Sequence, residues 1–97
     1  MKIKSFANLA TEKAYHRHFA KHLPTNIQTK AYRQLHAIDA ASNLNDLRVP
    51  PSNHLEKLVG DQEGQYSIAI NNQFRICFNL KSDDNAVENV EIIDYHH

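Results

Sequence analysis

Tryptophan is absent from this 97-residue chain, cysteine occurs once, glycine twice and proline three times. The single cysteine, Cys77, cannot form an intramolecular disulfide, which excludes a small scaffold held together by such bonds. No apolar run approaches the ~20 residues that a membrane-spanning helix needs, and the first residues lack a secretory pattern. The sequence therefore predicts a cytoplasmic protein with no membrane segment.

Net charge is also missing, because eleven Lys and Arg residues balance eleven Asp and Glu residues. A zero sum argues mildly against a nucleic-acid-binding protein. The distribution is uneven, however, since residues 1–33 carry about +6 and residues 34–97 about −6. Such asymmetry is compatible with one face that binds phosphate and another that binds a different partner, and equally with the solvated faces of a soluble domain.

Helical spacing of apolar residues dominates the first part of the chain. Residues 2–6 alternate between polar and apolar side chains, as in a short strand. Residues 8–22 predict a helix with a weak apolar stripe, and residues 25–41 predict an amphipathic helix. Thr25 and Gln28 have the spacing of a capping box at the start of the second helix.

The apolar period changes to two in the second part of the chain. Residues 65–70 and 73–80 predict a hairpin whose turn contains Asn71-Asn72, because asparagine tolerates a positive φ. Residues 87–94 predict a last strand. The order β-α-α-β-β-β predicts an α+β fold for a single domain over residues 1–97, with two N-terminal helices packed on a small antiparallel sheet.

Arg75 stands out in the predicted hairpin because it alternates with apolar neighbours. If Phe74 and Ile76 face the helices, Arg75 projects from the other face, among the small side chains of Ser67 and Ala69. A guanidinium group on this open surface can bind phosphate through two parallel hydrogen bonds. The same position also fits an exposed arginine that forms an ion pair with a neighbouring strand.

Tyr95 and His96 place a phenol and an imidazole side by side after the last predicted strand. Metal-free RNA cleavage needs one group that accepts the 2′-OH proton, one that donates a proton to the leaving 5′ oxygen, and a cation beside the phosphorane. Tyr95, His96 and Arg75 can supply these three functions. Spacing alone does not distinguish them from an ordinary terminal pair.

Two other patterns concern cations and metal ligands. Lys13, Arg17 and Lys21 follow an i, i+4, i+8 spacing and predict a basic ridge on the first helix. His18 and His22 have the i, i+4 spacing of two zinc ligands, but the spacing supplies no third ligand. The sequence therefore predicts neither a metal site nor a cofactor.

Five short motifs occur in order along the chain. They are residues 1–6 (MKIKSF), 35–41 (LHAIDAA), 46–60 (DLRVPPSNHLEKLVG), 72–78 (NQFRICF) and 94–96 (DYH). Together they resemble the HigB group of the RelE/ParE toxin superfamily. Members of that group carry I-[KR]-S-F, L-x-x-[IL]-D-[AT]-A, D-L-R-x-P-P-G-N-x-[LF]-E-x-L-x-G, [WY]-R-[IL]-x-F and [ED]-D-Y-H in this order.

The resemblance implies a type II toxin that cleaves messenger RNA on the ribosome and is neutralised by a HigA-like helix-turn-helix antitoxin. It implies that Arg75 stabilises phosphate charge and that Tyr95 and His96 transfer protons or position the substrate. The motifs and the charge distribution together predict RNA contacts from eight further side chains. These are His54, Lys57, Arg48, Lys13, Arg17, Lys21, Lys2 and Lys4.

The sequence departs from the family pattern at two places. Many relatives have an arginine where Ala69 stands, and some have a histidine and a lysine nearer to the positions of Glu56 and Val59 than to those of His54 and Lys57. Two alternatives therefore stay open. One is a non-catalytic ParE-like toxin that acts on DNA gyrase, and the other is a degenerate module that only binds an antitoxin.

Overall fold

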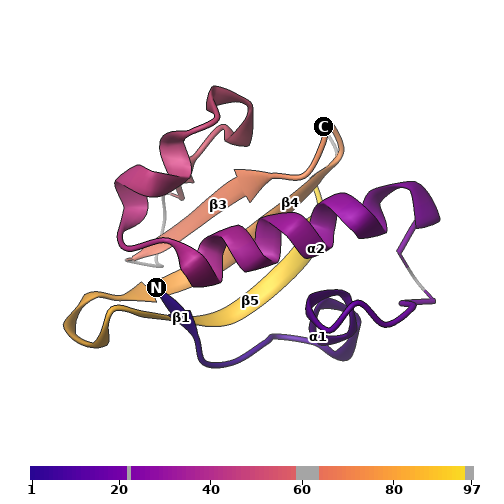
Figure 1. Ribbon diagram of the computed structural model, residues 1–97, viewed down its shortest axis with the longest axis horizontal. Helices are drawn as coiled ribbons and strands as arrows, with labels where there is room; N and C mark the ends of the chain where they lie inside the picture. Colours follow the sequence, from indigo (N-terminus) through magenta and orange to yellow (C-terminus); the bar gives the residue numbers. More distant parts are fainter. Residues whose placement is uncertain (22, 59–63, 96–97) are drawn as a thin grey trace.

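Two helices lie against one face of a five-stranded sheet in the computed structural model, which describes residues 1–21, 23–58 and 64–95 (Figure 1). The sheet order is β1-β5-β4-β3-β2. The predicted α+β fold is therefore confirmed. The elements are β1 (Lys2–Ile3), α1 (Leu9–Tyr15), α2 (Thr25–Ala40), β2 (Glu56–Lys57), β3 (Gln65–Ala69), β4 (Phe74–Lys81) and β5 (Ala86–Asp94), with 3₁₀ turns η1 (Leu44–Arg48), η2 (Pro51–Asn53) and η3 (Ser82–Asp84).

The sheet is mixed, whereas the sequence predicted antiparallel pairing throughout. The pairs β2–β3, β3–β4 and β4–β5 are antiparallel, but β1 runs parallel to β5, with Lys2 opposite Ala86. A hairpin fixes the direction of a strand locally, but β1 meets β5 only after the rest of the chain has been placed. The alternating pattern at residues 2–6 therefore predicts a strand but not its direction.

The β3–β4 hairpin is confirmed, with Ile68 opposite Ile76. The turn works through the side chain of Asn71 and not through a positive φ. Its Oδ1 atom accepts hydrogen bonds from the backbone N–H groups of Gln73 at 2.8 Å and Phe74 at 2.7 Å. This is the local hydrogen bonding by which asparagine favours turns.

Strand β5 contains a bulge at Asn89. Cys77 lies opposite Glu91 and Asn79 opposite Glu88, so β5 has one more residue than β4 between these pairs. Asn89 has a φ of 52°, a left-handed conformation that asparagine adopts more readily than most residues. Its backbone N–H donates to the hydroxyl of Ser5 at 2.9 Å, which anchors the chain segment after β1 to the bulge.

The first helix is shorter than predicted, because α1 ends at Tyr15 and not near residue 22. Arg17 has a φ of 60°, which is incompatible with a continuing α-helix. The residues that follow carry few apolar side chains at helical spacing, so packing does not favour extending α1.

The predicted capping box at the start of α2 is wrong. Pro24 occupies the position before the helix, and Thr25 is already its first residue. The side chain of Gln28 instead donates to the carbonyl groups of Ala20 at 3.1 Å and Leu23 at 3.0 Å. The side chain of Gln28 therefore holds the α1–α2 connection against α2. The capping-box pattern predicted instead that this side chain bonds to the backbone at the start of α2.

The hydrophobic core lies between the helices and the sheet. Leu35 and Ile38 from α2 pack there with Ile76 and Phe78 from β4, and all four are fully buried. Each buried side chain of this size contributes roughly 1.5–3 kcal/mol relative to an exposed one. Within residues 1–21, 23–58 and 64–95, no helix has the length and apolar character to cross a membrane.

Candidate functional site

Arg75 lies in β4 on the face of the sheet that points away from the core. Its neighbours in the strand, Phe74 and Ile76, pack in the core as predicted. Arg75 itself is only 8 % exposed, although the sequence predicted an open surface around it. Periodicity gave the correct face but could not show that the segment containing His54 and Glu56 contacts the guanidinium.

The guanidinium of Arg75 is held by three hydrogen bonds. Nε donates to the hydroxyl of Ser67 at 2.9 Å, and Nη2 donates to the carbonyl oxygens of His54 at 2.5 Å and Ser67 at 3.3 Å. No described residue accepts a hydrogen bond from Nη1. The described contacts therefore fix the guanidinium along the edge formed by Nε and Nη2.

A carboxylate and an aromatic ring lie beside the guanidinium. Oε2 of Glu56 is 3.8 Å from Nη2 of Arg75, and the Glu56 side chain is half exposed. The centroid of the Tyr95 ring is 5.7 Å from Cζ of Arg75, within the range of a cation–π contact. The structure thus brings Arg75 and Tyr95 together, whereas His96 lies outside the described residues.

Glu56 was not among the predicted site residues. It belongs to β2, where it lies opposite Ser67, the residue that also binds Arg75. A two-residue strand has no detectable periodicity, so β2 was not predicted. The only sequence signal was the family pattern, in which a glutamate follows the proline pair.

Gln34 and Asn53 support the segment that carries His54, and sequence reasoning missed both. Nε2 of Gln34 donates to Oδ1 of Asn53 at 2.9 Å and to the carbonyl of Ala69 at 2.8 Å. Nδ2 of Asn53 donates to the carbonyl of Leu47 at 3.1 Å. Buried amides are costly unless they are hydrogen-bonded, so this network fixes the 47–54 segment against α2 and β3. A glutamine on the apolar stripe of α2 was the available signal.

Small side chains surround Arg75 on its face of the sheet. Cys77 is buried there, and this burial raises the pKa of its thiol, although the positive charge of Arg75 acts in the opposite direction. Ala69 lies directly opposite Arg75 in the β3–β4 pair. An arginine at position 69 would therefore stand beside Arg75, whereas the alanine of this chain adds no second cation to this pair.

The residues predicted to contact RNA fall into two groups. His54, Lys57 and Arg48 have exposed side chains in the 48–57 segment, which adjoins Arg75 through the His54 carbonyl. The second group lies in β1, in α1 and in the segments that follow them. It consists of Lys2, Lys4, Lys13, Arg17 and Lys21.

The predicted basic ridge on the first helix is wrong. Lys13 lies in the last turn of α1, but Arg17 and Lys21 lie in the α1–α2 connection. The guanidinium of Arg17 stacks over the ring of Tyr32 in α2, with 5.2 Å between Cζ and the ring centroid. His18 is likewise not helical, and its predicted companion His22 lies outside the described residues.

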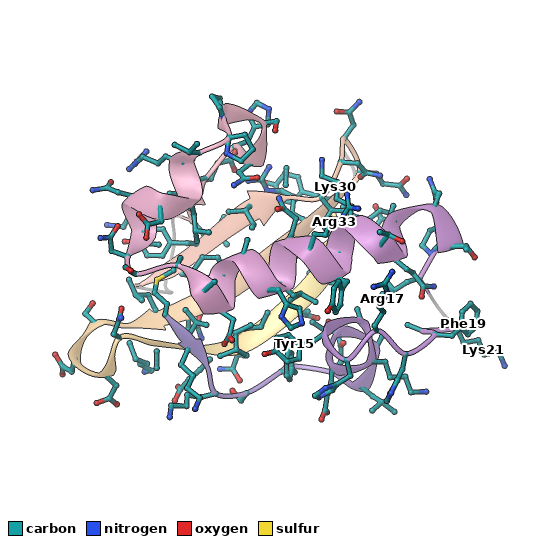
Figure 2. The ribbon with its side chains drawn as sticks, in the orientation of Figure 1. Tyr15, Arg17, Phe19, Lys21, Lys30 and Arg33 are labelled. Carbon is teal, nitrogen blue, oxygen red and sulfur yellow. The ribbon has the colours of Figure 1, made fainter. Side chains whose placement is uncertain are left out.

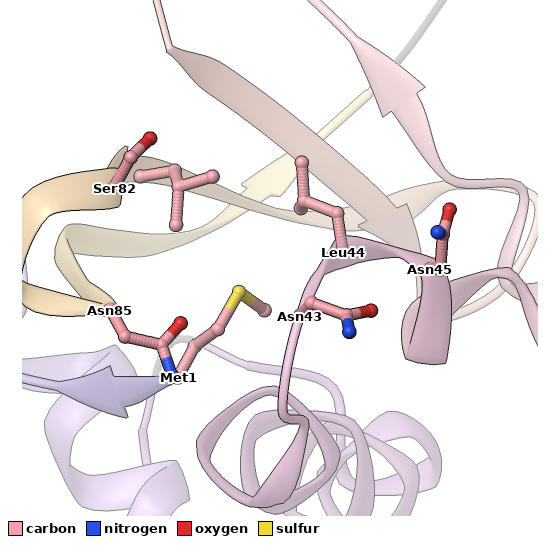
Figure 3. A pocket seen from close by; sticks show the side chains of 7 residues that line it. Met1, Asn43, Leu44, Asn45, Ser82 and Asn85 are labelled. Atoms are coloured by element: carbon pink, nitrogen blue, oxygen red, sulfur yellow. The ribbon is translucent and has the colours of Figure 1, made fainter.

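A second part of the described surface contains a cavity that lacks the predicted site residues. A cavity of about 330 Å³ lies between the first residue, the segment after α2 and the β4–β5 turn (Figure 3). None of the predicted site residues that the structure describes lines it, and its polar lining consists of the side chains of Asn43, Asn45, Ser82 and Asn85. Among the described residues, no group of three or more His, Cys, Asp or Glu could hold a metal ion.

The sequence matches a known family over most of its length. Residues 4–96 match the family described as the RelE-like toxin HigB of type II toxin–antitoxin systems. An uncharacterized protein of Haemophilus influenzae is 41% identical over 68 residues, which is 70% of this chain and 65% of that protein. Toxin HigB-1 of Vibrio cholerae is 41% identical over 56 residues, which is 58% of this chain and 59% of that toxin. The match thus spans less than two thirds of either relative.

Solved structures share the fold at lower identity. The YoeB dimer from Staphylococcus aureus has a TM-score of 0.61 and 23% identity, covering 100% of this chain and 98% of that one. The heterotetrameric YoeB–YefM toxin–antitoxin complex from the same organism has a TM-score of 0.59 and 20% identity, with full coverage of both chains. The fold is therefore that of RelE-like toxins. Because the family match extends over nearly the whole sequence, this chain belongs to the HigB-like family of RelE-like toxins of type II toxin–antitoxin systems.

Proposed function

We propose that this chain is a metal-independent endoribonuclease that cleaves messenger RNA on the ribosome and so inhibits translation and growth. The observation that carries the proposal is the fixed guanidinium of Arg75. It is oriented by Ser67 and by the carbonyl of His54, has no hydrogen-bond partner for Nη1 among the described residues, and lies beside Tyr95. A preorganised cation in a partly desolvated site stabilises developing phosphorane charge without a reorganisation cost.

The proposed reaction needs no co-reactant. The 2′ oxygen of the ribose forms a bond to the adjacent phosphorus while the bond from phosphorus to the 5′ oxygen breaks. One protein group accepts the 2′-OH proton and another donates a proton to the leaving 5′ oxygen. The products are a 2′,3′-cyclic phosphate and a 5′-hydroxyl end. Arg75 binds the phosphate, and Tyr95 and His96 transfer protons or hold the nucleotide.

Glu56 is a further candidate for the proton acceptor. Its carboxylate is 3.8 Å from Nη2 of Arg75 and half exposed, so a bound phosphate at Arg75 would lie within its reach. The carboxylate also attracts the guanidinium that binds the phosphate. Glu56→Gln removes the proton acceptor but keeps the size of the side chain. We expect the variant to bind ribosomes like the wild type but to cleave at least tenfold more slowly.

The remaining predicted cations serve RNA binding in this proposal. His54, Lys57 and Arg48 contact the messenger near Arg75, and Lys2, Lys4, Lys13, Arg17 and Lys21 contact ribosomal RNA. Such binding releases counterions, so it weakens steeply as the salt concentration rises. The toxin–antitoxin complex among the structural neighbours supports an antitoxin partner. We assign this partner to the HigA-like helix-turn-helix class and place the action of the toxin in the cytoplasm.

Growth arrest after induced expression tests the proposal. Wild type arrests growth, whereas Arg75→Ala and His96→Ala do not, at equal protein levels. Arg33→Ala is the matched control, because Arg33 is an exposed arginine in α2 outside the proposed site. Equal arrest by wild type and Arg75→Ala contradicts the catalytic assignment. Arrest with DNA damage and intact messages indicates a gyrase poison, and no arrest by the wild type indicates a binding module.

A further inference from the structure

Two large apolar side chains are exposed near α1. Leu9 is 63 % exposed and Phe19 is 67 % exposed. Figure 2 shows Phe19 and Lys21 at the outer end of the α1–α2 connection, away from the sheet. Exposed apolar side chains that lie together with surface hollows mark interaction sites more often than single exposed ones do.

Two hollows flank this connection. One, of about 210 Å³, is lined by Leu9, Ala10 and Ala20 together with Lys13 and Lys21. The other, of about 270 Å³, has Phe19 and Arg17 in its lining, with Ala14 at its base, since Ala14 is buried in the core. We call the surface formed by the two hollows and the connection the Leu9–Phe19 surface. Consecutive residues of the connection join the two hollows, because Phe19 lines one of them and Ala20 and Lys21 line the other.

The charge of the Leu9–Phe19 surface is positive. Lys13, Arg17 and Lys21 line its hollows, and no acidic residue from the described part of the chain does so. In the surrounding elements, the carboxylate of Glu12 is exposed on α1, while Asp39 is engaged by the backbone N–H of Ile3. The surface therefore complements a partner that carries carboxylates around apolar side chains.

A protein fits the apolar part of this surface better than RNA does. Contacts to phosphate groups need only cations. Aliphatic side chains such as Leu9 contribute little to the affinity for an RNA backbone. Protein interfaces, in contrast, have apolar anchors in hollows surrounded by a polar rim. The combination of Leu9 and Phe19 with three cations is that arrangement.

We propose that the Leu9–Phe19 surface is the docking site for an acidic, amphipathic segment of the antitoxin. This inference rests on the proposed function only in that a protein antitoxin exists. Neither hollow is lined by a described residue of the Arg75 site. Antitoxin binding and the chemistry at Arg75 therefore use separate side chains and are separable by mutation. Lys13, Arg17 and Lys21 are shared between the antitoxin and the ribosomal RNA of the proposed function, so the two partners compete for these cations.

Calorimetric titration of the purified full chain tests the proposal. The probe is the product of the adjacent reading frame, which the proposed function predicts to be a helix-turn-helix antitoxin. Leu9→Ser with Phe19→Ser removes both apolar anchors without changing the charge. We expect this double variant to bind the probe at least tenfold more weakly than wild type. The matched control is Val49→Ser, because Val49 is 73 % exposed and lies outside the surface. It should bind within twofold of wild type. Unchanged thermal unfolding verifies that the exposed substitutions leave the fold intact.

Three results would overturn the docking site. The first is that the double variant binds the probe within twofold of wild type. The second is that Val49→Ser loses as much affinity for the probe as the double variant does. The third is that the double variant loses tenfold in affinity for a single-stranded RNA oligonucleotide but still binds the antitoxin. Failure of the proposed function looks different. A wild type that binds the antitoxin through this surface but cleaves no messenger refutes the nuclease and leaves the docking site standing. A wild type that does not bind the probe refutes the docking site and the partner assignment together.

Discussion

The two faces of the sheet are buried in different ways. The face toward the helices is filled by large apolar side chains such as Ile68, Ile76 and Phe78, which interlock with α2. The opposite face carries Ser67, Arg75 and Cys77, which are also buried but include polar and charged groups. The first face needs only complementary shapes, whereas the second needs a hydrogen-bond partner for each buried polar atom.

This difference separates stability from function within a single strand. Alternate residues of β4 contribute to the core and to the candidate site. Substitutions on the core face therefore affect chiefly stability, whereas those on the opposite face affect the site as well. Burial of apolar area stabilises the first face, while the hydrogen bonds to Arg75 chiefly compensate for the removal of its charge from water. Substitutions on the two faces can therefore be compared at neighbouring positions.

The largest effect on stability is expected from the core face. Phe78→Ala removes a fully buried ring and should lower the free energy of unfolding by about 3–5 kcal/mol. Phe19→Ala, at a residue that is 67 % exposed, is the matched control and should change it by less than about 0.5 kcal/mol. Urea denaturation followed by circular dichroism measures both values. Similar losses in the two variants would contradict the assignment of the core.

A smaller effect is expected from the polar face. Ser67→Ala removes the acceptor for Nε of Arg75 and leaves a buried donor unpaired, which should lower the free energy of unfolding by roughly 1–3 kcal/mol. Cleavage should also fall, because the guanidinium loses part of its orientation. The exposed Ser52→Ala is the control for loss of a hydroxyl group, measured by the same denaturation. If Ser67→Ala matches Ser52→Ala in both properties, Ser67 does not position Arg75.

The smallest expected effect is on the pH dependence of stability, through Tyr15 in α1. Burial raises the pKa of the Tyr15 phenol from its usual 10.0, and the carboxylate of Asp39, 3.3 Å from the hydroxyl, raises it further. Because the folded state favours the neutral phenol, this contribution is complete below pH 10 and is lost as the pH rises through the raised value. The stability of Tyr15→Phe should therefore decline less above pH 10 than that of wild type. Denaturation at a series of pH values measures this. An equal decline of the free energy of unfolding with pH in the two proteins would contradict the prediction.

The parts of the fold that follow from local patterns were predictable. Apolar spacing identified α2, β3, β4 and β5, because each of these elements buries one face and is long enough to show its period. The short elements were not predictable. The two-residue strand β2 has no period, and the end of α1 at Tyr15 depends on how the connection packs against Gln28.

The candidate site was predictable in its chemistry but not in its surroundings. The alternating pattern predicted the face on which Arg75 lies. The sequence also predicted that Tyr95, after the last strand, acts together with Arg75, and the two side chains are in contact. The contacts from His54 and Glu56 come from a segment about twenty residues earlier, so only the tertiary structure reveals them. One of these contacts uses a backbone carbonyl, for which the sequence contains no signal.

Mapping of messenger RNA 5′ ends in cells expressing wild type or Arg75→Ala shows whether Arg75 is needed for cleavage. We expect new 5′-hydroxyl ends within translated codons for wild type. We expect none for Arg75→Ala, although that variant accumulates and still binds the antitoxin. The same ends in both strains, or wild-type growth arrest without any new ends, would contradict the assignment of Arg75 to the cleavage of messenger RNA.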